Sequence, residues 1–226
     1  MTLSVKIMSA RTRIKVCGMI DPFEAHSAVD LGVDALGFIF APASPRRLEP
    51  EKAREIIRSL PPFVDAVGVF VNEDVKAVGD IVRYCGLTVV QLHGDESPDY
   101  CRSLDCRVLK AFRIGSIADL AASTLYKGVV SGFLLDTMNA KLVGGTGQVF
   151  DWRLLDSCRP SGPLILAGGL TPENVAQAIQ QVRPYAVDVN SGVEIAPGRK
   201  DLGRLKSFVQ EVERWNNRHW SSRENL

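Results

Sequence analysis

The sequence lacks the features that mark membrane proteins and nucleic-acid-binding proteins. Its apolar runs all fall short of the roughly 18 residues that a membrane-spanning helix needs. Residues 1–10 contain no apolar segment typical of a signal peptide. The 27 lysine and arginine residues are balanced by 26 aspartate and glutamate residues, so no surplus of positive charge favours a nucleic acid. We therefore expect a cytoplasmic protein that binds neither a membrane nor a nucleic acid.

The sequence also lacks a disulfide framework and a zinc-binding motif. Its five cysteines show neither C-x-x-C spacing nor an even number, and its three histidines are scattered along the chain. The cysteines lie at positions 17, 85, 101, 106 and 158. We therefore expect free thiols and no metal site.

A repeated strand-then-helix pattern runs through the chain. Short, nearly continuous apolar runs are each followed by a polar segment compatible with a helix. The expected strands are residues 13–17, 34–40, 65–71, 88–93, 107–112, 129–136, 163–167 and 185–189. The first helix is expected to begin after Asp21 as its N-cap and to bury Phe23, Ala28, Val29 and Leu31.

This pattern predicts the α/β class and a single (β/α)8 barrel. Apolar strands alternating with helices indicate a parallel sheet, and eight such units close into a barrel at about this chain length. The barrel domain is expected to span residues 1–226, with a short N-terminal extension (about 1–10) and a polar C-terminal tail (about 216–226). The alternative, an open doubly wound sheet, would carry G-x-G-x-x-G after the first strand, where Gly18 stands alone.

Glycines at three successive strand ends predict a phosphate-binding site. Gly168 and Gly169 follow the seventh expected strand, Ser191 and Gly192 follow the eighth, and Gly145 lies in a glycine-rich loop after the sixth. Barrel enzymes often bind phosphate at the loops after strands seven and eight. Glycines also form simple turns, but their recurrence at three strand ends favours phosphate.

A thiol and a carboxyl group at the same rim are candidates for acid–base chemistry. Asp136 ends the sixth expected strand, and Cys17 ends the first with Lys15 two residues before it, on the same side of that strand. The alternatives without a function are a small buried residue for Cys17 and, for Asp136, a loop cap or an ion pair with Arg153.

Three further residues are candidates for contacts with a ligand. Arg46 follows Ser44 and Pro45 in a long loop and could bind a carboxylate, with Arg47 as the competing choice. His93 and Asp188 end the fourth and eighth expected strands and are weaker candidates for substrate binding.

Together these motifs resemble the phosphoribosylanthranilate isomerase family of tryptophan biosynthesis. The matching runs lie in order between about residues 13 and 201, at the strand ends of all units except the fifth. They include KVCG at 15–18, SPR at 44–46, VQLHG at 90–94, LLDT at 134–137, GGTG at 144–147, AGGL at 167–170 and VDVNSGVE at 187–194. The chain departs from the family pattern at Ile20, where threonine is usual, and at Asn190, where serine is common.

The resemblance implies an Amadori rearrangement of N-(5-phosphoribosyl)anthranilate to the corresponding aminoketose. By similarity, Asp136 is the general acid and Cys17 the general base, and Arg46 holds the anthranilate carboxylate. The phosphate is held by loops at Gly145, Gly168–Gly169 and Ser191–Gly192. A Schiff base is itself the electron sink, so no metal or cofactor is expected. The implied partner is a small phosphosugar, with the protein as a monomer or a homodimer.

Other readings stay open at this point. A pentulose-phosphate epimerase would use paired acids and metal-binding histidines, and a lyase like indoleglycerol-phosphate synthase would need a strand-end lysine, for which Lys110 is the candidate. A non-catalytic phosphosugar-binding module would keep the glycine loops but would not need Cys17 or Asp136.

Overall fold

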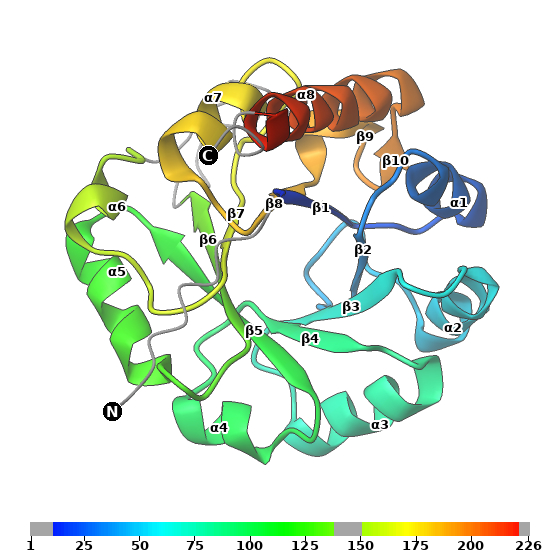
Figure 1. The fold of residues 1–226 in the computed structure, drawn as a ribbon. Helices are drawn as coiled ribbons and strands as arrows, with labels where there is room; N and C mark the ends of the chain where they lie inside the picture. The colour runs from blue at the N-terminus through cyan, green and yellow to red at the C-terminus, as the bar shows by residue number, and fades with distance from the viewer. Residues whose placement is uncertain (1–10, 138–150, 222–226) are drawn as a thin grey trace.

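The structure, a computed structural model, describes residues 11–137 and 151–221, with side chains up to residue 218. Within these ranges eight parallel strands form one closed barrel in sequence order, surrounded by helices (Figure 1). The predicted (β/α)8 barrel is therefore confirmed. The strands are Arg13–Cys17 (β1), Ala35–Ile39 (β2), Asp65–Phe70 (β3), Val89–Leu92 (β4), Arg107–Ile114 (β5), Gly132–Thr137 (β6), Leu164–Leu166 (β7) and Ala186–Val189 (β8).

A helix follows each barrel strand, as a right-handed parallel barrel requires. They are Pro22–Asp30 (α1), Pro50–Ser59 (α2), Val75–Cys85 (α3), Pro98–Ser103 (α4), Ile117–Ala122 (α5), Leu154–Ser157 (α6), Val175–Val182 (α7) and Leu202–Ser221 (α8). Asp21 caps α1 as expected, because its carboxylate accepts a hydrogen bond from the Glu24 backbone N–H at 2.9 Å.

The buried face expected for α1 is partly wrong. Phe23 is 69% exposed, and the buried residues of the helix are Glu24, Ala25 and Ala28. The cap fixes where the helix starts, and its turn geometry then directs position 23 toward solvent. The small side chains of Ala25 and Ala28 allow the helix to pack closely on the barrel.

Some elements differ from expectation. Strand β6 begins at Gly132, not residue 129, because the chain first closes a turn in which the Val129 N–H donates to the Tyr126 carbonyl. Helix α8 continues to Ser221, so most of the segment expected as a polar tail is helical. A hairpin of Glu194–Ala196 (β9) and Arg199–Lys200 (β10) was not expected, and it follows a short 3-10 turn at Ser191–Val193.

Alternation along each strand separates two environments. In β1, Ile14 and Val16 face the helices and belong to the main apolar core, whereas Cys17 belongs to a small separate cluster with Ile39 and Val69. A second small cluster apart from the main core includes Leu134 of β6 and Ala186 of β8. The residues that alternate with the main core therefore line the barrel interior, where the candidate site residues lie.

Candidate active site

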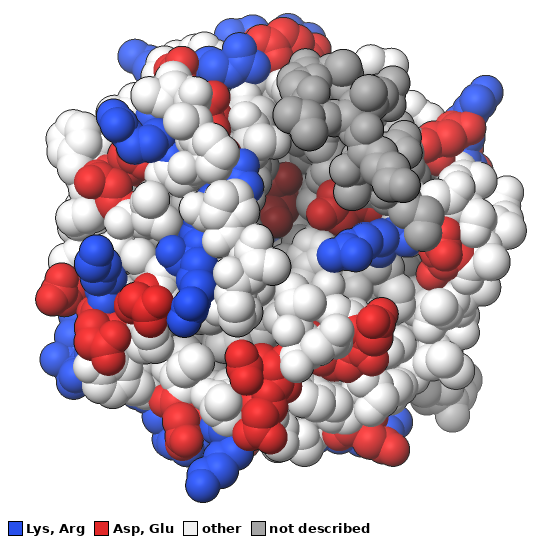
Figure 2. All heavy atoms as spheres, turned by 180° about the vertical axis from the view of Figure 1, so that it is seen from behind, with Lys and Arg blue, Asp and Glu red and all other residues white. Residues whose placement is uncertain are grey.

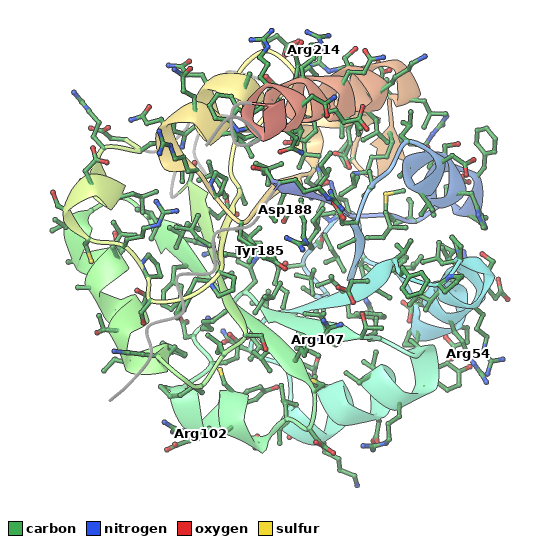
Figure 3. All side chains as sticks on the ribbon, in the orientation of Figure 1. Arg54, Arg102, Arg107, Tyr185, Asp188 and Arg214 are labelled. Carbon is green, nitrogen blue, oxygen red and sulfur yellow. The ribbon has the colours of Figure 1, made fainter. Side chains whose placement is uncertain are left out.

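The candidate residues come from strands that meet inside the barrel. Figure 2 shows the end of the barrel opposite to that seen in Figure 1, hollowed at its centre and with acidic side chains in the hollow. Asp188 lies near the barrel axis in Figure 3. In the strand register, Lys15 of β1 is paired with Asp188 of β8, and Cys17 with Gly37 of β2.

A buried ion pair joins β1 to β8. Lys15 Nζ donates to Asp188 Oδ2 at 2.8 Å, and the side chains are only 4% and 7% exposed. The second oxygen, Asp188 Oδ1, is buried and has no hydrogen-bond partner among the described residues. A buried carboxylate oxygen that has no partner and lies near the barrel axis is suited to accept a hydrogen bond from a hydroxyl group of a ligand.

The thiol of Cys17 lies beside this pair. Burial raises the pKa of Cys17, Lys15 opposes that effect through its charge and a hydrogen bond, and Asp188 adds to it. The net pKa lies above the usual value, so the thiol is protonated in the free protein at neutral pH. The sequence-based expectation that Lys15 shares the side of Cys17 is confirmed.

Asp136 pairs with a histidine on the opposite part of the wall. Its Oδ2 lies 3.4 Å from His93 Nε2, and its Oδ1 accepts the Thr137 N–H at 2.8 Å. Gln91 Nε2 lies 3.0 Å from His93 Nδ1. An amide nitrogen only donates, so in this orientation of the Gln91 amide Nδ1 accepts the hydrogen bond, and a proton on Nε2 would face Asp136.

The ion pair between Asp136 and Arg153, considered from the sequence, does not form. Arg153 pairs with Asp151 at 2.8 Å. The side chain of Asp136 is 31% exposed, so its carboxyl group is open to a ligand in the hollow.

Arg46 is held by a carboxylate that the sequence did not identify. Its Nη2 lies 2.6 Å from Glu194 Oε2, and its Nε donates to Oε1 at 3.0 Å. Glu194 Oε1 also accepts from the buried Lys200 Nζ at 2.8 Å, and Lys200 donates in turn to the Cys17 carbonyl at 2.6 Å. The Glu194 side chain takes the Nε and Nη2 edge of the guanidinium, so Nη1 is available to a second anion.

The competing arginine lies in a different environment. Arg47 is 46% exposed and pairs with Glu49 at 3.3 Å, also at the surface. A loosely held surface arginine is less suited to orient a ligand than one fixed by a bidentate partner.

The glycines expected at the phosphate site fall at the predicted strand ends. Gly168 and Gly169 follow β7 and have φ values of 82° and 67°. A Cβ at Gly168 would lie 2.6 Å from Asp136 Oδ1 and even closer to the Thr137 backbone. Only glycine therefore allows this loop to pass directly beside the carboxyl group. Ser191 and Gly192 form the turn after β8, whereas Gly145 lies outside the described residues.

One rival activity loses its candidate residue. Lys110 Nζ is buried and donates to the Gly94 carbonyl at 2.6 Å and to Glu96 at 3.1 Å, so it does not reach the rim as a catalytic acid. No group of three or more histidine, cysteine or acidic residues within 11–137 and 151–221 could hold a metal ion. Among the same residues, no helix is long and apolar enough to span a bilayer.

Sequence reasoning missed Glu194, Lys200 and Gly37. Glu194 and Lys200 lie in the unexpected hairpin, and their contacts reach back across 148 and 183 residues of chain to Arg46 and Cys17. Gly37, which lies against Cys17, looks in the sequence like an ordinary strand residue. Only the spacing of Lys15 from Cys17 carried a signal for the ion pair.

Comparison with known proteins identifies close relatives along nearly the whole barrel. The family model described as N-(5'phosphoribosyl)anthranilate (PRA) isomerase matches residues 14–211. The N-(5'-phosphoribosyl)anthranilate isomerase of Trichlorobacter lovleyi is 51% identical over 202 residues, which cover 89% of this chain and 98% of that protein. The enzyme of Moorella thermoacetica is 51% identical over 208 residues, covering 92% of each chain.

Solved structures give the same result. The phosphoribosyl anthranilate isomerase of Thermotoga maritima is 43% identical, with a TM-score of 0.85 over 89% of this chain and 98% of that chain. Another structure of a phosphoribosyl anthranilate isomerase, in complex with reduced 1-(o-carboxyphenylamino)-1-deoxyribulose 5-phosphate, is 41% identical, with a TM-score of 0.81 over the same shares.

Proposed function

We propose a mechanism from one premise, which is that this chain belongs to the N-(5'-phosphoribosyl)anthranilate isomerase family. It is an isomerase of tryptophan biosynthesis. It converts N-(5-phosphoribosyl)anthranilate to 1-(2-carboxyphenylamino)-1-deoxyribulose 5-phosphate, an Amadori rearrangement by general acid–base catalysis. The proposal concerns which residues of this chain perform each step.

Asp136 acts as the general acid and Cys17 as the general base. Protonated Asp136 donates its proton to the ribose ring oxygen, the ring opens and a Schiff base forms. The thiolate of Cys17 then removes the C2 proton, and the electron pair moves into the Schiff base to give an enolamine. The enolamine tautomerises to the ketose. His93 keeps its Nε2–H toward Asp136 and steadies the carboxylate that remains after proton donation.

One observation carries this assignment. The Asp188 carboxylate pairs with Lys15, whose Nζ shares the space at Gly37 with Cys17 Sγ, and Asp188 is also near enough to Asp136 and His93 for their charges to act on it. The thiol and the acid therefore flank the same small region of the hollow, which suits a base and an acid that act on neighbouring atoms of one sugar.

The remaining residues bind the substrate. Arg46, oriented by Glu194, holds the anthranilate carboxylate through its Nη1 edge. Asp188 Oδ1, which has no partner among the described residues, accepts a hydrogen bond from a sugar hydroxyl group. Backbone N–H groups at Gly145, Gly168–Gly169 and Ser191–Gly192 hold the phosphate, as loops after strands seven and eight commonly do.

No further partner or cofactor enters this mechanism. A structure of monomers generated from the dimeric phosphoribosylanthranilate isomerase of Thermotoga maritima is 40% identical to this chain, and for this chain either a monomer or a homodimer stays a prediction. The cytoplasmic location, the single-domain boundaries and the absence of nucleic-acid binding stay predictions as well.

Activity measurements on two variants test the assignment. We expect Cys17→Ala and Asp136→Asn each to lower kcat at least about 100-fold, the usual effect of losing general acid or base help. The measurement follows the loss of fluorescence of phosphoribosylanthranilate on mixing with the purified protein. Cys85→Ala is the matched control, because Cys85 is buried on α3, and we expect it to retain wild-type kcat.

Comparable kcat in either test variant would remove that residue from the mechanism. Binding of the substrate without turnover by the wild-type protein would instead favour the phosphosugar-binding module.

A further inference from the structure

We propose that Lys15 is a positioning residue that holds a positive charge against Cys17 and so stabilises the thiolate in which Cys17 acts as base. The inference rests on the proposed function, because it assigns the group that prepares the base of that reaction. Lys15 itself does not touch the reacting atoms in this account.

The backbone builds a place for the ammonium beside the sulfur. Lys15 and Cys17 alternate with Val16 on β1 and point to the same side, and both face Gly37 of β2. A Cβ at Gly37 would lie 2.8 Å from Cys17 Sγ and 3.2 Å from Lys15 Nζ. The missing side chain at position 37 therefore opens one space that the sulfur and the ammonium fill together.

Asp188 fixes the other side of the ammonium. Its Oδ2 lies 2.8 Å from Lys15 Nζ, and both side chains are more than nine-tenths buried. An ammonium held in this way has lost its freedom to turn to solvent, so its remaining N–H groups stay directed into the interior.

The charges around the thiol support the same assignment. Burial lowers the pKa of Lys15, but Asp188 and Cys17 outweigh it, so the pKa of Lys15 lies above its usual value and the ammonium stays charged. Lys200 of β10 also favours the thiolate through its charge. The charges of Glu194 and Arg46 act in turn on Lys200. Asp188 of β8 disfavours the thiolate of Cys17. The charges of Asp136 and His93 act in turn on Asp188.

The chemistry needs such a charge. Cys17 becomes a base when its S–H bond breaks, the proton passes to water and the electron pair stays on sulfur. Burial opposes that ionisation. One ammonium shared by a carboxylate and a thiol offsets the cost, since the thiolate becomes its second counterion.

The first experiment titrates Cys17 directly. The ultraviolet absorbance of the thiolate is followed against pH in the wild type and in Lys15→Met, each corrected by subtracting the same protein carrying Cys17→Ala. We expect the midpoint in Lys15→Met to rise by at least about one pH unit, which is tenfold less thiolate at a given lower pH. The acidic limb of kcat/KM is expected to move with it, while KM changes less.

Asp188→Asn is expected to shift the titration midpoint of Cys17 in the opposite direction. Removing the competing anion leaves the thiolate as the principal counterion of Lys15, so the midpoint of Cys17 is expected to fall. A purely structural role for the pair predicts damage in both variants and no opposed shifts. The double variant Lys15→Met/Asp188→Asn removes both charges of the pair, so neither partner is left buried without a counter-charge, as one is in each single variant. Its Cys17 midpoint is expected above that of the wild type.

Lys110→Met is the matched control. Lys110 forms another deeply buried lysine–carboxylate pair on the described part of the chain, with Glu96 at 3.1 Å, and we expect its loss to lower stability without moving the Cys17 midpoint. An unchanged midpoint in Lys15→Met and in the double variant would overturn the inference. This outcome differs from failure of the proposed function, which would appear as full activity of Cys17→Ala.

Discussion

Glu194 is the residue on which two cations of the site depend. Its carboxylate holds Arg46 through Nε and Nη2 and the buried Lys200 through Nζ. Burial raises the pKa of Glu194, but the hydrogen bonds from Arg46 and Lys200 outweigh it, so the net pKa lies below its usual value. The folded protein therefore keeps Glu194 ionised at neutral pH.

Glu194→Gln is expected to raise KM and lower stability. Arg46 loses its bidentate partner and its orientation toward the substrate carboxylate, and Lys200 is left buried without a counter-charge, which costs about 3 kcal/mol. Steady-state kinetics and urea unfolding at neutral pH measure the two effects. Because the folded pKa is depressed, the stabilisation is present above the unfolded pKa and is lost as the pH falls through the folded value, so wild type and variant converge in acid.

The control for Glu194 is an exposed pair of the same kind. Glu49→Gln breaks the surface pair with Arg47, and we expect a loss of less than about 1 kcal/mol with no change in KM. Equal KM in Glu194→Gln and wild type would contradict the orienting role of Glu194.

Residues at strand ends were the easiest to predict from the sequence. Cys17 and Asp136 each follow an apolar run, and the period of two places them inside the barrel once the run is recognised as a strand. Glu194 could not be found in this way, because it lies in an unexpected hairpin and its partner Arg46 comes from a segment 148 residues away.

At the scale of elements, α5 shows how a short helix is held by its first turn. The Asp119 carboxylate accepts hydrogen bonds from the N–H groups of Gly115 and Ser116, at 3.0 and 2.8 Å, and from the Ser116 hydroxyl at 2.9 Å. The Gly115 N–H above all, then Ser116, lowers the pKa of Asp119. A helix of six residues has little stability of its own, so its start depends on this cap.

Asp119→Ala is expected to lower the free energy of unfolding by about 1 kcal/mol at neutral pH. The pKa of Asp119 is depressed in the folded state, so this contribution exists above the unfolded pKa and disappears as the pH falls through the folded one. Urea unfolding at neutral and acidic pH tests both statements. Asp30→Ala is the control, since Asp30 ends α1, where a carboxylate faces the negative end of the helix dipole and its loss is not destabilising. An equal loss at both pH values would show that the anion is not the stabilising form.

The elements themselves were predictable, but some of their ends were not. Every strand–helix unit was anticipated, because buried parallel strands and capped helices leave strong local patterns. Val129 and Val130 looked like the start of β6, yet they pack on the core from a turn, since apolar side chains serve a turn against the barrel as well as a strand. The β9–β10 hairpin is too short to leave a pattern.

At the scale of the whole molecule, the last helix is tied to the start of the first strand. Asn216 of α8 accepts a hydrogen bond from the Thr12 N–H at 2.8 Å and donates to the Thr12 carbonyl at 3.0 Å, across 204 residues of sequence. Thr12 is 6% exposed and directly precedes β1, which pairs with β8 to close the barrel. The amide of Asn216 thus satisfies both backbone groups of Thr12 as a neighbouring strand would.

Asn216→Ala is expected to lower the free energy of unfolding by about 2 kcal/mol, because it leaves two part-buried backbone groups without partners. Gln210→Ala is the control on the same helix, where the side chain is exposed and the expected change is within about 0.5 kcal/mol. Urea unfolding compares the two variants. KM in Asn216→Ala is expected to stay at the wild-type value, since Thr12 lies at the opposite end of β1 from Cys17. A loss no larger than that of Gln210→Ala would mean that the Asn216 amide adds nothing to the β1–β8 ladder in closing the barrel.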